Sequence, residues 1–201
     1  MSSYNEKAKQ SFNTRLRFFK FNCVVNDVPF TKENFLKFKI EKNEDIVSVY
    51  TTQYCQWFEQ DLLENIPKKL TVRDAYEAIE KLQLTDESDW FNDYFEQFKE
   101  RYPSEIYLKH SKADTCGYCK ITLETINLLV NKKKIFKKPY QRGYSMEIDR
   151  RKPNLEYTAE NCVPCCYWCN NAKTDEFTDD EFISIAKEIR KSLENRLADD
   201  N

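Results

Sequence analysis

Two cysteine pairs constrain the fold of this chain more than any other feature of its sequence. Cys116 and Cys119 form one C-x-x-C pair, and Cys166 and Cys169 form a second. Two such pairs can close a tetrahedral zinc site, because each contributes two thiolates from one tight turn. Forty-six residues separate the pairs, so the intervening chain must form structure of its own. We therefore expect these four cysteines to bind a structural Zn²⁺ ion.

The alternatives for these cysteines are four buried thiols or a redox-active pair. A thioredoxin-like redox site needs only one C-x-x-C pair and a βαβ setting, which this stretch lacks. Cys162 and Cys165 lie beside the second pair and are alternative ligands, although the C-x-x-C spacing favours the pair itself. Cys23 and Cys55 have apolar neighbours, and we expect both in the core.

The composition predicts a packed and largely helical protein. Apolar residues make up 40% of the chain and aromatic residues 14%, which argues against disorder. Only two glycines are present, so tight turns are few, and Gly117 lies inside the first cysteine pair, where a tight turn is needed. We expect a mostly helical α+β fold, with a helix-rich N-terminal domain over residues 1–105 and a zinc-containing domain with a C-terminal helix over residues 106–201.

Hydrophobic periodicity predicts a strand and a helix in the first third of the chain. Alternating apolar residues over 19–25 predict a strand that ends in a turn at Asn26 and Asp27. A second pattern has apolar residues one helical turn apart and predicts a helix that Pro67 ends. The members of this second pattern are Tyr54, Phe58, Leu62 and Ile66.

Capping patterns mark the beginnings of two further helices. Thr71 with Asp74 begins one of them, and Thr178 with Glu181 begins the last helix of the chain. Between them, a helix is expected over residues 86–102, and we expect its aromatic stripe to form core and not a base-stacking platform. That stripe is Phe91, Tyr94, Phe95 and Phe98; the stripe of the last helix is Phe182, Ile185, Ala186, Ile189 and Leu193.

The residues between and after the cysteine pairs form a pattern of their own. Asp149 follows the segment 144–148, Asn161 precedes Cys166 by five residues, and Asn170 directly follows Cys169. In these spacings the chain resembles the zinc-knuckled HNH endonucleases, whose fold is the ββα-metal motif. The resemblance covers about residues 115–174, which is under a third of the chain.

The resemblance implies a second metal site and assigns its ligands. By position, Asp149 and Asn170 would bind one divalent cation, Mg²⁺ or Mn²⁺, and Asn161 would brace the loop between the two strands. The predicted catalytic residues are Asp149, Arg150, Asn161 and Asn170. A hard cation prefers oxygen ligands, which a carboxylate and an amide supply, and it would stabilise the phosphate and the leaving oxygen. Lys173, one helical turn beyond Asn170, could offer charge to the same phosphate.

Arg150 departs from the family pattern, which has a general-base histidine after the strand-end aspartate. Arginine stays protonated and accepts no proton at neutral pH. His110 is the single histidine, and it is either a catalytic group or a surface or capping residue. Otherwise the metal activates water without a side-chain base, or the site binds without cutting. Asp149 could also form an ordinary salt bridge with Arg150 or Arg151.

A basic segment lies between the cysteine pairs of an otherwise acidic chain. Residues 131–152 hold nine Lys or Arg against two acidic residues, whereas the whole chain has a net charge of −2. Such a segment is either a solvated face or a contact surface for phosphates. We expect it to bind the nucleic-acid backbone with little sequence specificity. The predicted nucleic-acid-binding residues are Lys132, Lys133, Lys134, Lys137, Lys138, Arg142, Arg151 and Lys173.

These patterns predict a metal-dependent endonuclease that acts on phosphodiester bonds, most readily in DNA. The alternative is a catalytically inactive, zinc-stabilised module that binds nucleic acid or protein on the same frame. The N-terminal helices could, in addition, bind a protein partner. No apolar run is long enough to span a membrane, and no secretory signal is recognisable, so we expect a cytoplasmic protein.

Overall fold

The computed structural model describes residues 3–56, 61–136 and 143–198, and the chain divides into two compact units. The helical unit comprises Asn5–Glu100 together with Asn154–Glu156, and the cysteine unit comprises Met1–Tyr4, Arg101–Pro153 and Tyr157–Asn201. The expected mostly helical α+β fold is confirmed. The predicted domains at 1–105 and 106–201 stay a prediction.

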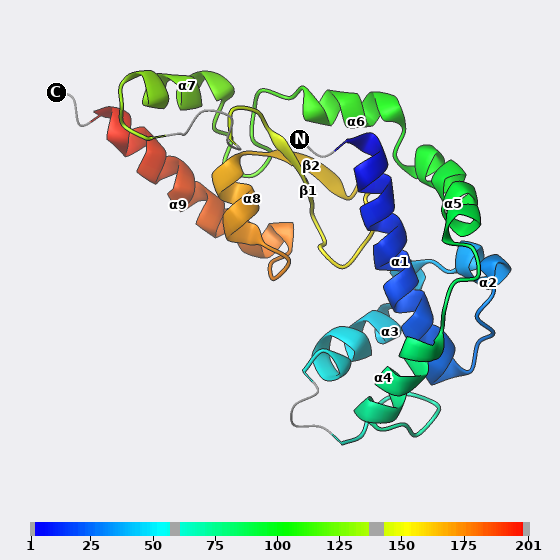
Figure 1. The fold of residues 1–201 in the computed structure, drawn as a ribbon. Helices are drawn as coiled ribbons and strands as arrows, with labels where there is room; N and C mark the ends of the chain where they lie inside the picture. Colours follow the sequence, from blue (N-terminus) through cyan, green and yellow to red (C-terminus); the bar gives the residue numbers. More distant parts are fainter. Residues whose placement is uncertain (1–2, 57–60, 137–142, 199–201) are drawn as a thin grey trace. The chain divides into compact units, whose positions relative to one another are not determined.

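Short helices around one long helix make up the helical unit (Figure 1). Its elements are α1 (Tyr4–Asn26), α2 (Lys32–Lys37), the 3₁₀ helix η1 (Ile40–Lys42), α3 (Glu44–Val49), the π-helical turn η2 (Tyr50–Tyr54), α4 (Val72–Lys81) and α5 (Glu87–Arg101). One part of its core joins Phe21 and Val25 of α1 with Ile46 of α3 and Ala75 of α4. A second part is aromatic, with the Phe12 ring edge-on to those of Phe35, Phe91 and Tyr94.

The strand predicted over residues 19–25 is wrong, because this segment belongs to α1. Phe18, Phe19, Phe21 and Val25 are all buried, so α1 is covered on more than one side and its apolar residues need not follow a single stripe. The predicted turn is present: Asp27 has a positive φ of 56°, the left-handed conformation that commonly ends a helix.

The helix predicted to run from Tyr54 to Ile66 is also wrong. Helical backbone ends at Tyr54, and Leu62 instead pairs with Thr71 in an antiparallel bridge. Asn65 has a φ of 60°, which reverses the chain and brings these segments together. Leu63 is buried and Leu62 is exposed, the opposite of the helical pattern. Phe58 lies outside the described residues.

Both predicted capping patterns are confirmed. The Thr71 hydroxyl accepts a hydrogen bond from the Asp74 amide at 3.0 Å, at the beginning of α4. At the beginning of the last helix, α9 (Asp179–Ala198), the Glu181 carboxylate accepts hydrogen bonds from the backbone amide and the hydroxyl of Thr178. The helix predicted over 86–102 is α5, where Tyr94 and Phe98 are buried as expected.

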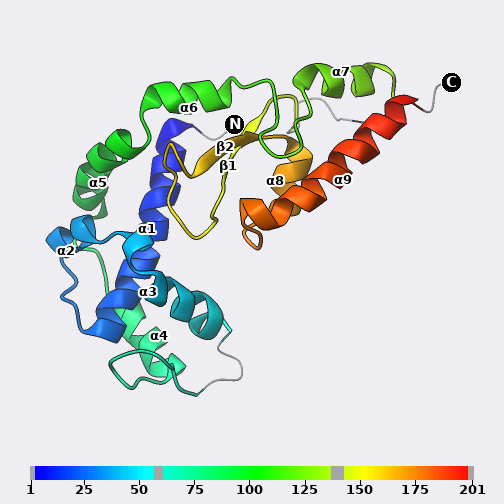
Figure 2. The same ribbon diagram turned by 180° about the vertical axis from the view of Figure 1, so that it is seen from behind.

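The cysteine unit is built around a two-stranded antiparallel hairpin. Its elements are α6 (Ser104–Ser111), α7 (Leu123–Asn131), β1 (Glu147–Arg150), β2 (Cys162–Cys165), α8 (Tyr167–Lys173) and α9. Glu147 pairs with Cys165, and Asp149 pairs with Val163. Helix α6 packs on both strands, and α9 lies beside α7 and α8, as the front and back views agree (Figures 1 and 2).

Gly117 is required by a close approach between the first cysteine pair and β2. A Cβ atom at this position would lie 2.1 Å from Cγ2 of Val163, which no side chain could tolerate without movement. The Gly117 amide donates to the Pro164 carbonyl at 2.7 Å. The sequence predicted a tight turn here, and the structure shows that the lack of a side chain is what lets this turn lie against the strand.

The last helix buries much of its predicted apolar stripe. Phe182, Ala186 and Leu193 are buried, and Ile189 packs against the same core, whereas Ile185 is exposed. No helix within the described ranges combines the length and the apolar character needed to cross a bilayer.

Candidate functional site

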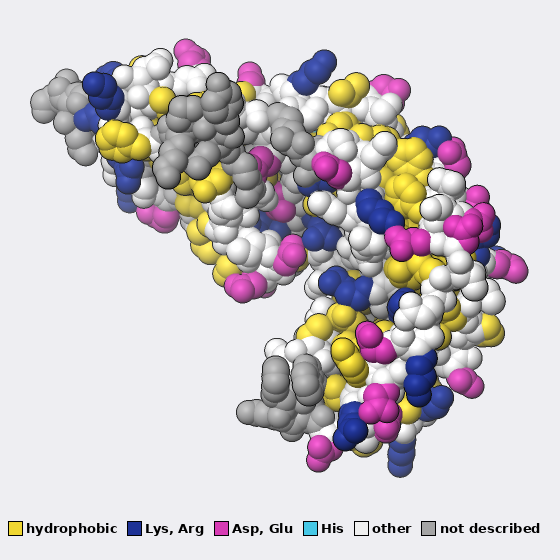
Figure 3. Space-filling view, in the orientation of Figure 1, with side chains coloured by type: hydrophobic (Ala, Val, Ile, Leu, Met, Phe, Trp, Pro, Cys, Tyr) yellow, Lys and Arg dark blue, Asp and Glu magenta, His cyan; other side chains and the backbone are white. Residues whose placement is uncertain are grey.

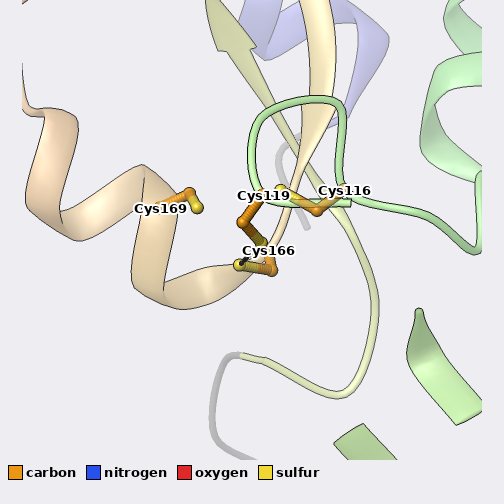
Figure 4. Close-up of side chains that lie close together, drawn as sticks. All are labelled: Cys116, Cys119, Cys166 and Cys169. Carbon is orange, nitrogen blue, oxygen red and sulfur yellow. Dashed lines mark hydrogen bonds between the residues drawn. The ribbon is translucent and has the colours of Figure 1, made fainter. Parts of the chain in front are cut away.

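Four cysteine side chains converge at the junction of the hairpin and α8 (Figure 4). Cys116 and Cys119 come from the turn after α6, Cys166 caps the beginning of α8, and Cys169 lies in its first turn. All four are buried, and their sulfur atoms lie within 4.8 Å of one another. The four expected cysteines are therefore brought together. Cys162 and Cys165, in β2, are not members of this cluster.

The spacing of the sulfur atoms suits zinc. A tetrahedral site with Zn–S bonds of about 2.3 Å separates its sulfur atoms by about 3.8 Å, and Sγ of Cys119 lies 3.7 Å from Sγ of Cys166. Hydrogen bonds from the other three thiols lower the pKa of Cys116, while the pKa values of Cys166 and Cys169 are raised, chiefly by their contacts with Cys116. Because four buried sulfur donors lie this close together, the cluster could hold Zn²⁺.

Cys23 and Cys55 differ in their exposure to solvent. Cys23 is buried as expected, and burial raises its pKa to about 12, which makes it an unreactive core thiol. Cys55 is exposed, so its predicted place in the core is wrong. It follows the π-helical turn, where the predicted helix does not continue.

Beside the cysteine cluster, two contacts between side chains join β1 to α8. Side chains alternate along a strand, so Glu147 and Asp149 lie on one face of β1, and residues three apart share one face of α8. The first contact joins Asn170 to Glu147, with the Asn170 amide donating to Oε2 of the carboxylate at 2.5 Å. The second joins Lys173 to Asp149, with Nζ 3.2 Å from Oδ2.

Asp149 is held by two donors on the same oxygen atom. Besides Lys173, the Tyr118 hydroxyl donates to Oδ2 of Asp149 at 2.8 Å. Burial and the neighbouring Asp149 carboxylate raise the pKa of Tyr118 far above its ordinary value, so this hydroxyl stays protonated and donates. Tyr118 lies between Cys116 and Cys119, so the first cysteine turn directly positions the Asp149 carboxylate.

Lys173 was predicted from the sequence to face the phosphate, but the structure places its side chain against β1. Its side chain is 0% exposed, and Nζ donates to the Arg150 carbonyl at 2.8 Å in addition to its ion pair with Asp149. A buried and doubly bonded ammonium is a poor contact for nucleic acid in solution. The structure therefore makes Lys173 a partner of β1.

The two arginines after Asp149 pair with acidic residues of other elements. Arg150 contacts Asp175 at 3.2 Å, and its guanidinium carbon lies 5.1 Å from the centre of the Tyr157 ring. Arg151 contacts Asp179, at the beginning of α9, at 2.8 Å. The ordinary salt bridge considered for Asp149 is therefore present, but its partner is Lys173.

Asn161 closes the connection between the two strands. Its side chain accepts from the Lys152 amide at 2.9 Å and donates to the Lys152 carbonyl at 3.1 Å, while its own carbonyl accepts from the Arg151 amide at 2.7 Å. This is the bracing geometry expected of Asn161 from the family resemblance. Its part in catalysis stays a prediction.

His110 lies on α6, and its ring contacts the hydroxyl of a tyrosine. Nδ1 of His110 lies 2.9 Å from the Tyr102 hydroxyl. Burial lowers the pKa of His110, and the positive charges of Lys109 and Arg151 lower it further. These contacts agree with a packing role for His110, and a catalytic role stays untested.

The basic segment follows α7. Lys132 and Lys133 are exposed, and the backbone carbonyl of Lys134 accepts from Arg196 of α9 at 3.2 Å. Lys137, Lys138 and Arg142 lie outside the described residues.

Two residues of this site were missed by sequence reasoning. Glu147 had one signal, because it stands two residues before Asp149 and therefore on the same strand face. Tyr118 had none, because nothing local distinguishes an aromatic residue in a C-x-x-C turn that packs inward from one that points to solvent.

The oxygen donors between β1 and α8 suit a hard divalent cation. Two carboxylates and one amide, from Glu147, Asp149 and Asn170, lie on facing elements, and this is the donor chemistry that Mg²⁺ and Mn²⁺ prefer. The Lys173 ammonium already partly neutralises Asp149. Asp149 and Asn170 therefore supply the kind of donor atoms that one divalent cation would need.

Comparisons of this chain with known proteins find a weak likeness to a solved structure. No protein-family model matches the chain, and no curated protein matches it. Among solved structures, the rare-cutting HNH restriction endonuclease PacI is similar to it, with 18% sequence identity, a TM-score of 0.36, and coverage of 68% of this chain and 89% of that chain. That likeness is too low to support any inference.

Proposed function

We propose that this protein is a metal-dependent endonuclease that hydrolyses phosphodiester bonds, most readily in DNA and with low intrinsic sequence specificity. The observation that carries the proposal is the pair of contacts between β1 and α8, where Asp149 and Asn170 are each held by a polar partner beside the cysteine cluster. Ligands that are oriented in advance favour a metal site over a fortuitous cluster.

In the proposed site, Asp149 and Asn170 would hold the divalent cation. Bound there, the cation would supply the charge that stabilises the phosphate and the leaving oxygen and lowers the pKa of bound water. Tyr118 and Lys173 fix the Asp149 carboxylate. Arg150 cannot act as a general base, because its guanidinium stays protonated. Its pairing with Asp175 instead links the end of β1 to the segment after α8.

A second candidate function is a zinc-stabilised binding module without catalysis. The specific observation in its favour is the ion pair of Lys173 with Asp149, because a buried ammonium beside the carboxylate competes with a divalent cation. The charge distribution also favours it. On the face seen in Figure 3, acidic and basic side chains of the described residues are interspersed and form no large basic surface.

The experiment that separates these functions is cleavage of supercoiled plasmid and of a structured RNA by zinc-loaded protein. The protein is freed of loosely bound metal on a chelating resin, so that Mg²⁺ or Mn²⁺ can be added back without stripping the cysteine site. The proposal predicts nicking of the plasmid that depends on the added cation. No cleavage of either substrate by folded, zinc-loaded protein would favour the binding module.

The basic segment gives a prediction about binding. Changing Lys132, Lys133 and Lys134 to Gln should weaken DNA binding and flatten the plot of log affinity against log salt, by about one unit for each lost phosphate contact. Fluorescence anisotropy with a labelled duplex measures this slope. The salt concentration is varied from about 50 to about 200 mM, the range over which such slopes are resolved. A control with the same charge change is Lys42, Lys69 and Lys81 to Gln, all exposed in the helical unit. Equal slopes for the two variants would contradict the assignment.

A further inference from the structure

Glu147 is the residue at this site whose part the proposed function leaves open. It is the first residue of β1, and its carboxylate accepts the hydrogen bond from the Asn170 amide. Asn170 lies directly after Cys169 in α8. The contact therefore links β1 to the position that directly follows Cys169 of the cysteine cluster.

The chemistry of this contact fixes which end of the Asn170 amide faces Glu147. An ionised carboxylate only accepts hydrogen bonds, whereas an amide has a donating nitrogen and an accepting oxygen. Only the nitrogen can face Glu147, so Oδ1 is the atom of Asn170 left to bind a cation. If Glu147 were absent, the amide could turn over and present its nitrogen, which cannot bind a metal ion.

We propose that Glu147 is a positioning residue that orients the Asn170 amide so that Oδ1 serves as a ligand of the divalent cation. The inference rests on the proposed function, because it needs a cation site between β1 and α8. Asp149 is held in a parallel way, since Tyr118 and Lys173 both contact Oδ2. Each of the two proposed ligands thus has a partner that fixes its orientation, and such partners strongly affect metal affinity.

The test measures Mn²⁺ binding directly, independently of cleavage. Zinc-loaded full-length variants are titrated with Mn²⁺, and free Mn²⁺ is followed by electron paramagnetic resonance. Glu147→Ala should weaken Mn²⁺ binding about 10- to 100-fold, with the zinc content unchanged. Glu147→Gln keeps an oxygen that can accept from Asn170 and should recover most of the affinity. Glu160→Ala, an exposed change in the same unit, is the matched control.

A double-mutant cycle separates a positioning residue from a ligand. If Glu147 acts through Asn170, adding Glu147→Ala to Asn170→Ala should change Mn²⁺ affinity less than about twofold, because nothing is left to orient. An additive loss would make Glu147 a ligand itself and overturn the inference. Mn²⁺ binding that is indifferent to Glu147 would overturn the inference alone, whereas a wild-type protein that binds no Mn²⁺ would overturn the proposed metal site as well.

Discussion

The Cys169→Ser protein should lose its zinc, and its cysteine unit should unfold. In the wild-type protein, four cysteine sulfur atoms lie within 4.8 Å of one another. The serine hydroxyl is not ionised at neutral pH and replaces a thiolate poorly, so the variant keeps only three zinc ligands. Structural zinc contributes folding free energy on the order of 10 kcal/mol, which is comparable to the whole net stability of a typical domain. The buried residues that pack around the cluster, including Tyr118 and Phe182, would lose the zinc-bound cysteines on which they pack.

The matched control for this prediction is Cys165→Ser. Cys165 is equally buried and nearly adjacent in sequence, but it lies outside the cluster. Metal analysis should find about one zinc per chain in this control and in the wild-type protein, and almost none in Cys169→Ser. Circular dichroism and limited proteolysis report the folding of each variant. A Cys169→Ser protein that keeps both its zinc and its melting temperature would contradict the assignment of the cluster.

Glu156→Ala should destabilise the helical unit by about 3–5 kcal/mol, the usual cost of removing one partner of a buried ion pair. The Glu156 carboxylate contacts the Arg15 guanidinium at 3.2 Å and accepts from the Tyr94 hydroxyl at 2.6 Å. The side chains of Arg15 and Glu156 are only 1% and 2% exposed. Without Glu156, the buried Arg15 would keep its charge but lose its counter-ion, since arginine does not deprotonate.

Urea denaturation and hydrogen exchange in peptides of α1 and α5 measure this effect, because both partners of Glu156 lie on those helices. Glu160→Ala is the control, since Glu160 is exposed in the same connection between β1 and β2, and its change should alter stability by no more than about 0.5 kcal/mol. Similar stability of both variants would mean that Arg15 finds another partner, such as Gln97, which it already contacts at 2.8 Å.

Local patterns predicted the parts of this protein that depend on neighbouring residues in the chain. A C-x-x-C turn brings two sulfur atoms together by itself, so the four members of the cluster could be named from spacing. The capping pairs at Thr71 and Thr178 likewise act within one helical turn. Each of these predictions needs no knowledge of distant residues.

Distant contacts decided what the sequence could not predict. Seven residues of α1 fit a strand as well as a helix, and only burial on several sides by other helices selects the helix. Arg15 and Glu156 are 141 residues apart, and Tyr118 and Asp149 are 31 apart, so no periodicity links them. The sequence placed Lys173 one helical turn after Asn170, and this position led to the prediction that it faces phosphate. The sequence did not reveal which face of α8 packs on β1.

The measurement that tests the proposed nuclease site most directly is metal-dependent plasmid nicking by the Asp149→Asn protein beside wild type. Asn is preferred to Ala because it keeps an oxygen for the Tyr118 and Lys173 contacts while removing the charge that a divalent cation needs. Rates are compared at a temperature where zinc content and circular dichroism show both proteins to be folded, with Glu160→Ala as the control. The proposed site predicts that nicking in Mg²⁺ falls about 100-fold or more in Asp149→Asn alone. Nicking at the wild-type rate by folded Asp149→Asn protein would contradict it and place the active site elsewhere.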